Sequence, residues 1–173
     1  LVIKHFPGVA APFRERRPQY VLVEISDAKS EASGREAIES VFAAGMERGV
    51  VLDAVVAQSL AQAQAMWALR ENVTEAQARE GQNIKHDVSV PVSRIAEFIA
   101  VTDAEVRRAH PQARMLTFGH LGDGNLHYNV AGPQELAPEA FMREAEGLIR
   151  IVHDIVSRFN GSISAEHGLG QAK

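Results

Sequence analysis

The sequence of 173 residues contains no cysteine, which excludes disulfides, thiolate metal ligands and cysteine nucleophiles. It also lacks an apolar run of the roughly 18 to 20 residues that a transmembrane helix needs, and it shows no secretory signal pattern. Its 18 basic and 22 acidic residues form no basic stripe, so a nucleic-acid partner is not expected. These absences favour a cytoplasmic protein without a transmembrane segment, and they leave a membrane-peripheral position open.

Hydrophobic residues make up 46% of the chain, which is enough for one well-buried core and predicts a single domain. Short β-branched or alternating runs predict strands, and apolar residues at helical spacing predict helices between them. The predicted strands are 20–25, 50–57, 85–90, 114–120, 125–130 and 162–165. Long helices between short strands, with one hairpin, predict an α+β fold: a ferredoxin-like sandwich with a largely antiparallel sheet and helices on one face.

Capping residues set the predicted ends of the helices. Ser33 with Glu36 is typical of a capping box that opens the first helix, and Gly49 suits its C-terminal end. Ser59 with Gln62 opens a second helix, which fades near residue 81. The two remaining helices are bounded by Pro91 and Pro111 and by Pro138 and Gly161.

A hairpin turn is indicated by Leu121 to Gly124, between two of the predicted strands. If His120 lies opposite Asn125, then His127 lies opposite Phe118 and the two imidazoles are diagonal neighbours. The residues that share this face are His120, Asn125, His127 and Asn129. Diagonal neighbours are about 7 to 8 Å apart at the backbone, a span that two imidazoles can close around one cation. Two solvated histidines are the alternative interpretation.

A second pattern runs from Ser162 to Gly170, where a predicted strand enters a glycine turn that carries Glu166 next to His167. Irregular backbone at Gly168 and Gly170 would let both side chains reach one site. Glu166 would then complete a set of two imidazoles and a carboxylate with open coordination positions, which is the pattern of a catalytic zinc-like site. His167 would remain uncoordinated. A capping or surface role for this pair is the alternative.

A third pattern is the apolar stripe of the second helix, on which Arg70 and Thr74 follow Trp67. This spacing predicts that the Arg70 guanidinium faces the buried side, where an unpaired charge is unfavourable. Its partner is either a nearby glutamate or the carboxylate of a bound ligand, which a planar bidentate donor suits well. Lys85 alternates with polar residues on one strand face, and this pattern alone indicates an ordinary exposed lysine.

These motifs together resemble the C-terminal, substrate-side domain of FAD-linked oxidases and dehydrogenases of the vanillyl-alcohol oxidase class. The matching members are the D-2-hydroxyglutarate, D-lactate and glycolate enzymes. The motifs that carry the resemblance are Gly119 to Asn129 and Ile163 to Gly170, supported by Trp67-x-x-Arg70-Glu71 and Lys85 to Pro91. Two long motifs in order, with two supporting ones, are far more specific than a single histidine pair.

The resemblance implies a chemistry as well as a fold. It implies a divalent metal, most often zinc, bound by His120, His127 and Glu166, with His167 as the general base. The positions that it implies for substrate binding are Arg70, Thr74, Lys85 and Asn129. A metal on the substrate hydroxyl would lower its pKa, so that the base can take the proton while hydride leaves for the flavin.

The same resemblance implies that FAD is bound mainly by an N-terminal domain that this sequence does not contain. We therefore interpret residues 1–173 as one substrate- and metal-side domain of a larger flavoenzyme. This domain is also expected to lack the family's C-terminal extension and to be inactive alone. Its expected partners are a small 2-hydroxyacid, its own FAD domain and an electron acceptor that the sequence does not identify. The alternatives are a metal-dependent hydrolase and a non-catalytic small-molecule-binding domain of the same fold.

Overall fold

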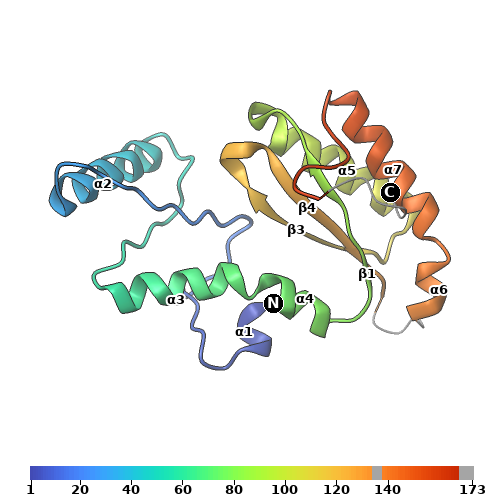
Figure 1. The fold of residues 1–173 in the computed structure, drawn as a ribbon, viewed down its shortest axis with the longest axis horizontal. Helices are drawn as coiled ribbons and strands as arrows, with labels where there is room; N and C mark the ends of the chain where they lie inside the picture. Colours follow the sequence, from blue (N-terminus) through green and yellow to red (C-terminus); the bar gives the residue numbers. More distant parts are fainter. Residues whose placement is uncertain (134–137, 168–173) are drawn as a thin grey trace. The chain divides into compact units, whose positions relative to one another are not determined.

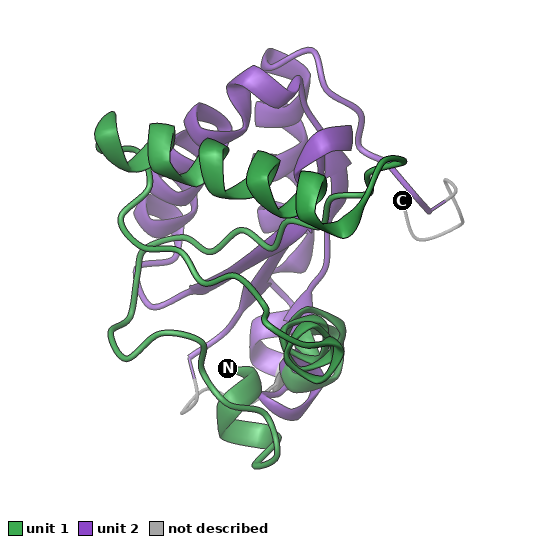
Figure 2. Ribbon diagram, turned by 90° about the vertical axis from the view of Figure 1, so that its left-hand side faces the viewer, with its two compact units in different colours: residues 1–76 green, residues 77–173 purple. Residues whose placement is uncertain are grey.

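The computed structural model describes residues 1–133 and 138–167, and it divides into two compact units. Residues 1–76 form the first unit, shown in green in Figure 2, and the second, shown in purple, starts at residue 77. The first unit is helical and the second combines helices with an antiparallel sheet, so the chain has the predicted α+β class.

The first unit contains α1 (Val2–His5), α2 (Glu31–Glu47) and α3 (Leu60–Glu71), while α4 (Val73–Arg79) leads into the second. The predicted cap of α3 is confirmed, because the Ser59 hydroxyl accepts a hydrogen bond from the amide of Gln62. The predicted capping box of α2 is wrong by one turn. Ser30 is the N-cap and its hydroxyl accepts from the amide of Ser33, which places the start of the helix earlier.

Two predicted strands of the first unit, 20–25 and 50–57, are absent from the structure. Both segments lack ladder partners, and Val21 and Val50 are 66% and 70% exposed. β-Branched residues favour extended backbone, but a strand forms only where a second segment can accept its hydrogen bonds. The predicted second helix is also divided, at Asn72 between α3 and α4, where the Asn72 side-chain amide donates to the Ala68 carbonyl.

The sheet of the second unit is built around β4 (Asn125–Ala131), with β3 (Arg114–His120) on one side. On the other side lie β1 (Asn83–Ile84) and β2 (Asp87–Ser89), and all three pairings are antiparallel. Ser162 adds a single antiparallel bridge to Ser89 at the outer edge. From this edge inward, the sheet runs from Ser162 through β2 and β4 to β3. One helix follows β2 in the sequence and another follows β4, which is the ferredoxin-like arrangement.

Two predicted strands are shorter than expected. The predicted strand 85–90 is confirmed only at β2, residues 87–89, and β1 lies before it at residues 83–84. Between the two, the His86 amide donates to the Asn129 side chain instead of a strand backbone. The predicted strand 162–165 is reduced to the one-residue bridge at Ser162. Beyond it the amides of residues 165–167 donate to the Asp87 carboxylate rather than to a neighbouring strand.

Helices α5 (Ile95–Ala109) and α7 (Ala145–Arg158) cover one face of this sheet, as Figure 1 shows. A short turn, η1 (Val92–Arg94), precedes α5, as the proline at 91 predicts. The core joins both helices to β4, where the Phe98 and Tyr128 rings meet edge to face at 6.2 Å. Its largest fully buried apolar side chains are Tyr128, Phe98, Leu148 and Ile155, followed by the valines at 88, 106, 130, 152 and 156.

The last predicted helix, 138–160, is two helices in the structure, α6 (Pro138–Met142) and α7. A tight turn separates them, in which the Glu144 amide bonds the Phe141 carbonyl, and Phe141 is buried against Gly132. The left-handed residue after α7 is Asn160, with φ +55°, rather than the glycine that follows it. None of the helices in the described residues is long and apolar enough to cross a membrane.

Candidate metal centre

The β3–β4 hairpin has the register that its sequence predicts. His120 pairs with Asn125, and Phe118 pairs with His127. The turn η2 (Leu121–Asp123) is closed by Gly124, whose φ of +70° lies in the left-handed region that glycine adopts without strain. The predicted shared face therefore exists, and it is opposite the face on which Tyr128 packs under the helices.

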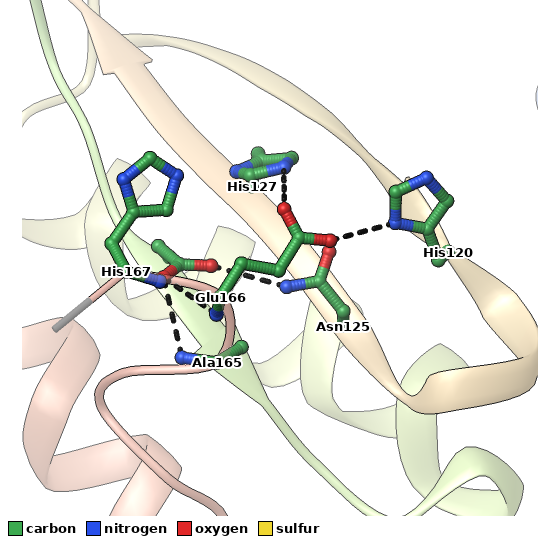
Figure 3. A network of polar contacts seen from close by, with 7 residues as sticks. His120, Asn125, His127, Ala165, Glu166 and His167 are labelled. Atoms are coloured by element: carbon green, nitrogen blue, oxygen red, sulfur yellow. Dashed lines mark hydrogen bonds and ion pairs between the residues drawn. The ribbon is translucent and has the colours of Figure 1, made fainter.

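The Glu166 carboxylate lies between the two hairpin histidines (Figure 3). Its Oε1 is 2.8 Å from Nδ1 of His120, and its Oε2 is 3.6 Å from Nε2 of His127. His127 is largely buried, whereas the other two side chains are about half exposed. Two imidazoles and one carboxylate from distant parts of the sequence thus meet at the surface of the sheet, as the sequence predicts.

His167 lies on the other side of His127 from His120 in Figure 3. Its ring is perpendicular to that of His127, with 6.2 Å between the centroids. The His127 ring also packs on Phe118, which is 4.8 Å away by the same measure. The sequence predicts that Phe118 lies opposite His127 in the hairpin, but it does not identify Phe118 as a site residue.

Asp87 is the site residue that sequence reasoning missed. It is only 6% exposed, and its Oδ2 accepts hydrogen bonds from the amides of Ala165 (3.2 Å), Glu166 (3.0 Å) and His167 (2.8 Å). Its Oδ1 accepts from the side-chain amide of Asn125 at 3.1 Å. Burial raises the pKa of Asp87, but these four hydrogen bonds outweigh it and hold the pKa below the ordinary value.

Asp87 also belongs to a set of possible cation ligands. One ligand atom each from Asp87, His127 and Glu166 lie within 4.8 Å of one another. This set differs from the predicted one by Asp87 in place of His120. Four N–H groups already bond the Asp87 carboxylate, three at Oδ2 and one at Oδ1, so a cation bound there would compete with these hydrogen bonds. This competition favours His120 over Asp87 as the third ligand.

Two further predicted residues lie in the second unit. Asn129 is buried, its amide nitrogen donates to Gln77 at 2.8 Å, and its oxygen accepts from the His86 amide at 3.3 Å. One N–H of Asn129 is therefore engaged within the protein. Lys85 is exposed, as its alternating pattern predicts.

Arg70 and Thr74 lie in the first unit, on α3 and at the start of α4. Their predicted inward stripe is not buried in this unit, because Leu60 at its start is 75% exposed and Trp67 donates from its indole to Glu24 near the surface. Helical spacing shows which residues share a side, but it does not show that the side is covered. Gly168 and Gly170 lie outside the described residues.

Known proteins resemble this chain over nearly its whole length. The chain matches the model of a family described as FAD linked oxidases, C-terminal domain, over residues 2–173. D-2-hydroxyglutarate dehydrogenase of Xanthomonas citri pv. viticola is 42% identical over 168 residues, which cover 96% of this chain and 34% of the relative. The mitochondrial enzymes of the same name from Arabidopsis thaliana and Rattus norvegicus are 37% and 38% identical over 100% and 92% of this chain.

The chain thus spans between 28% and 34% of the length of these relatives. The family match, in contrast, extends over nearly all of the chain. It includes both motifs that build the cluster of His120, His127 and Glu166. This protein therefore belongs to the FAD linked oxidase C-terminal domain family.

Proposed function

We propose that this chain is the substrate- and metal-binding part of an FAD-dependent D-2-hydroxyacid dehydrogenase, which oxidises the α-hydroxyl of its substrate to a 2-oxoacid. The observation that carries the proposal is the Glu166 carboxylate, which bridges His120 and His127. The family match and the relatives named D-2-hydroxyglutarate dehydrogenase support it. Among the D-2-hydroxyacids, D-2-hydroxyglutarate is therefore the first candidate substrate, before D-lactate and glycolate.

His120, His127 and Glu166 are the residues that would hold a divalent cation, for which zinc is the first candidate. The fit rests on the donor set, because two imidazoles and one carboxylate are typical ligands of catalytic zinc and leave room for a substrate. Bound there, the cation would lower the pKa of a substrate hydroxyl. His127 is held in place by the Phe118 ring against which it packs.

His167 is the general base in this proposal. Its ring lies beside that of His127, and its backbone is fixed by a 2.8 Å hydrogen bond from its amide to Asp87. The α-hydroxyl would lose its proton to the His167 imidazole, and the α-carbon would lose a hydride, which leaves the 2-oxoacid. FAD, bound mainly by the remainder of the full-length protein, would accept that hydride.

The proposed substrate-binding residues are Arg70, Thr74, Lys85 and Asn129. Arg70 offers a planar pair of N–H donors that match a carboxylate, and Lys85 offers a mobile ammonium for the same group or a second one. Asn129 would contribute the amide hydrogen that Gln77 does not use. Fixing the acid at these groups would orient its α-carbon toward the flavin.

The experiment that tests this function is dye reduction by the purified full-length protein with D-2-hydroxyglutarate, D-lactate and glycolate. The L-enantiomers of the two chiral acids serve as controls. We expect turnover with at least one of the three acids and, for the chiral ones, with the D-form only. Zinc-dependent cleavage of an ester or amide without any hydroxyacid oxidation would instead identify a hydrolase, and binding without turnover would identify a non-catalytic domain.

A further inference from the structure

The segment that carries Glu166 and His167 has little strand pairing of its own. Its bridge to β2 consists of two hydrogen bonds of 2.9 Å between the backbones of Ser89 and Ser162. After Ser162, the amides of residues 165–167 all donate to the side chain of Asp87. Asp87 lies in β2, the same strand as the bridge residue Ser89. The dashed lines in Figure 3 show these amides converging.

Three successive N–H groups that point at one oxygen form a concave anion site, as in backbone nests that bind phosphate. Here the anion is a side chain of the same protein, and it is 6% exposed. Hydrogen bonds to an ionised acceptor are about twice as strong as neutral ones. The Asp87 carboxylate therefore constrains the backbone of Glu166 and His167 through charge-assisted hydrogen bonds.

Asp87 constrains the hairpin as well as this segment. Its Oδ1 accepts from the Asn125 amide nitrogen, so the Asn125 oxygen must point away from Asp87. That oxygen is buried and accepts no hydrogen bond within the described residues. One buried carboxylate thus links β4, where His127 lies, to the segment that carries the third ligand.

We propose that Asp87 is a positioning residue, which holds the Glu166 carboxylate against His120 and His127 and holds His167 beside them without binding the metal itself. This inference rests on the proposed metal site. Residues that support metal ligands from outside the coordination sphere change metal affinity by about 10- to 100-fold when they are removed. The same range is expected for loss of the Asp87 charge.

The test compares Asp87→Asn with Asp103→Asn in the full-length protein. Asparagine keeps the size of the side chain but removes the charge that the three amides share. Asp103 is a matched control, because its carboxylate accepts a 2.8 Å hydrogen bond from Tyr128 on the opposite face of β4. Zinc affinity is measured by competition with a chromophoric chelator, together with the melting temperature and the kcat and KM for the hydroxyacid.

We expect Asp87→Asn to weaken zinc binding by about 10- to 100-fold and to lower kcat more than it raises KM. Asp103→Asn should keep the wild-type zinc affinity even if its melting temperature falls by a similar amount. Unchanged zinc affinity in Asp87→Asn would overturn the proposal. So would an equal loss of affinity in both variants, because it would show that any loss of stability weakens the site.

A measurement on the unmodified protein covers the case in which Asp87→Asn does not fold. Hydrogen–deuterium exchange should show protected amides at residues 165–167, although this segment lies outside a regular strand. Exchange at the rate of an open loop would contradict the proposal. Neither exchange nor zinc affinity depends on turnover. Protected amides and a zinc defect without any hydroxyacid oxidation would therefore refute the proposed function and leave the positioning role intact.

Discussion

Replacing Gly161 by alanine is expected to destabilise the protein and to displace the segment that carries Glu166. A Cβ at this position would overlap the backbone oxygen of Ser89 and would lie 3.0 Å from methyl groups of Val90 and Val156. The backbone must therefore move away from β2, and the two hydrogen bonds between Ser89 and Ser162 are lost or weakened.

The expected loss of stability has two contributions, the weakened hydrogen bonds and the overpacking at Gly161. Two backbone hydrogen bonds contribute about 1 to 3 kcal/mol in total. Overpacking of a well-filled position adds about 1 to 3 kcal/mol. With partial relaxation, we expect a loss of about 2 to 4 kcal/mol, which lowers the melting temperature of a domain of this size by roughly 4 to 16 °C.

Gly147→Ala is the matched control for this experiment. Gly147 lies in α7 and a Cβ there would have no atom within 4 Å, so alanine should stabilise the helix by about 0.5 to 1 kcal/mol. Melting temperature and zinc affinity are measured for both variants in the full-length protein. If Gly161→Ala melts within about 1 °C of the wild type or binds zinc equally well, the packing of this segment against β2 is not as described.

Three other changes have expected outcomes. His167→Ala should lower kcat by about 10²- to 10⁴-fold and leave zinc affinity unchanged, because the imidazole acts as a base and not as a ligand; a variant with normal kcat would refute that role. Removal of metal with a chelator should abolish hydroxyacid oxidation and added zinc should restore it, whereas full activity after chelation would show that no metal is needed. Tyr128→Phe should lower stability by about 1 to 2 kcal/mol with little change in kcat, because its hydroxyl donates to the partly exposed Asp103 far from the site; a loss of activity without a loss of stability would contradict this.

The hairpin could be predicted from sequence because its geometry is local. The turn length and the alternation of side chains determine which residues face each other, so the pairing of His120 with Asn125 and of Phe118 with His127 followed directly. The approach of Glu166 is not local, since it comes from a segment 46 residues after His120. The glycine turn after Glu166 suggested a third ligand but left a capping or surface role open, and the resemblance of its motif to a family favoured the shared site.

The role of Asp87 could not be predicted, because an alternating pattern cannot distinguish a solvated aspartate from one that accepts amides almost 80 residues away in the sequence. The available signal for a buried role was the position of Asp87 next to Val88, which is buried in the sheet. The segments 20–25 and 50–57 show the opposite error. Their composition favours strands, but composition does not supply a partner strand.

The central claim is that one cation is held between His120, His127 and Glu166, and an anomalous-difference map locates such a cation directly. Crystals of the zinc-loaded full-length protein would be measured on both sides of the zinc absorption edge. We expect one peak within about 2.0 to 2.2 Å of a nitrogen of each histidine and of a Glu166 oxygen. A peak bound by Asp87 instead of His120, or no peak at this site in zinc-loaded crystals, would contradict the account.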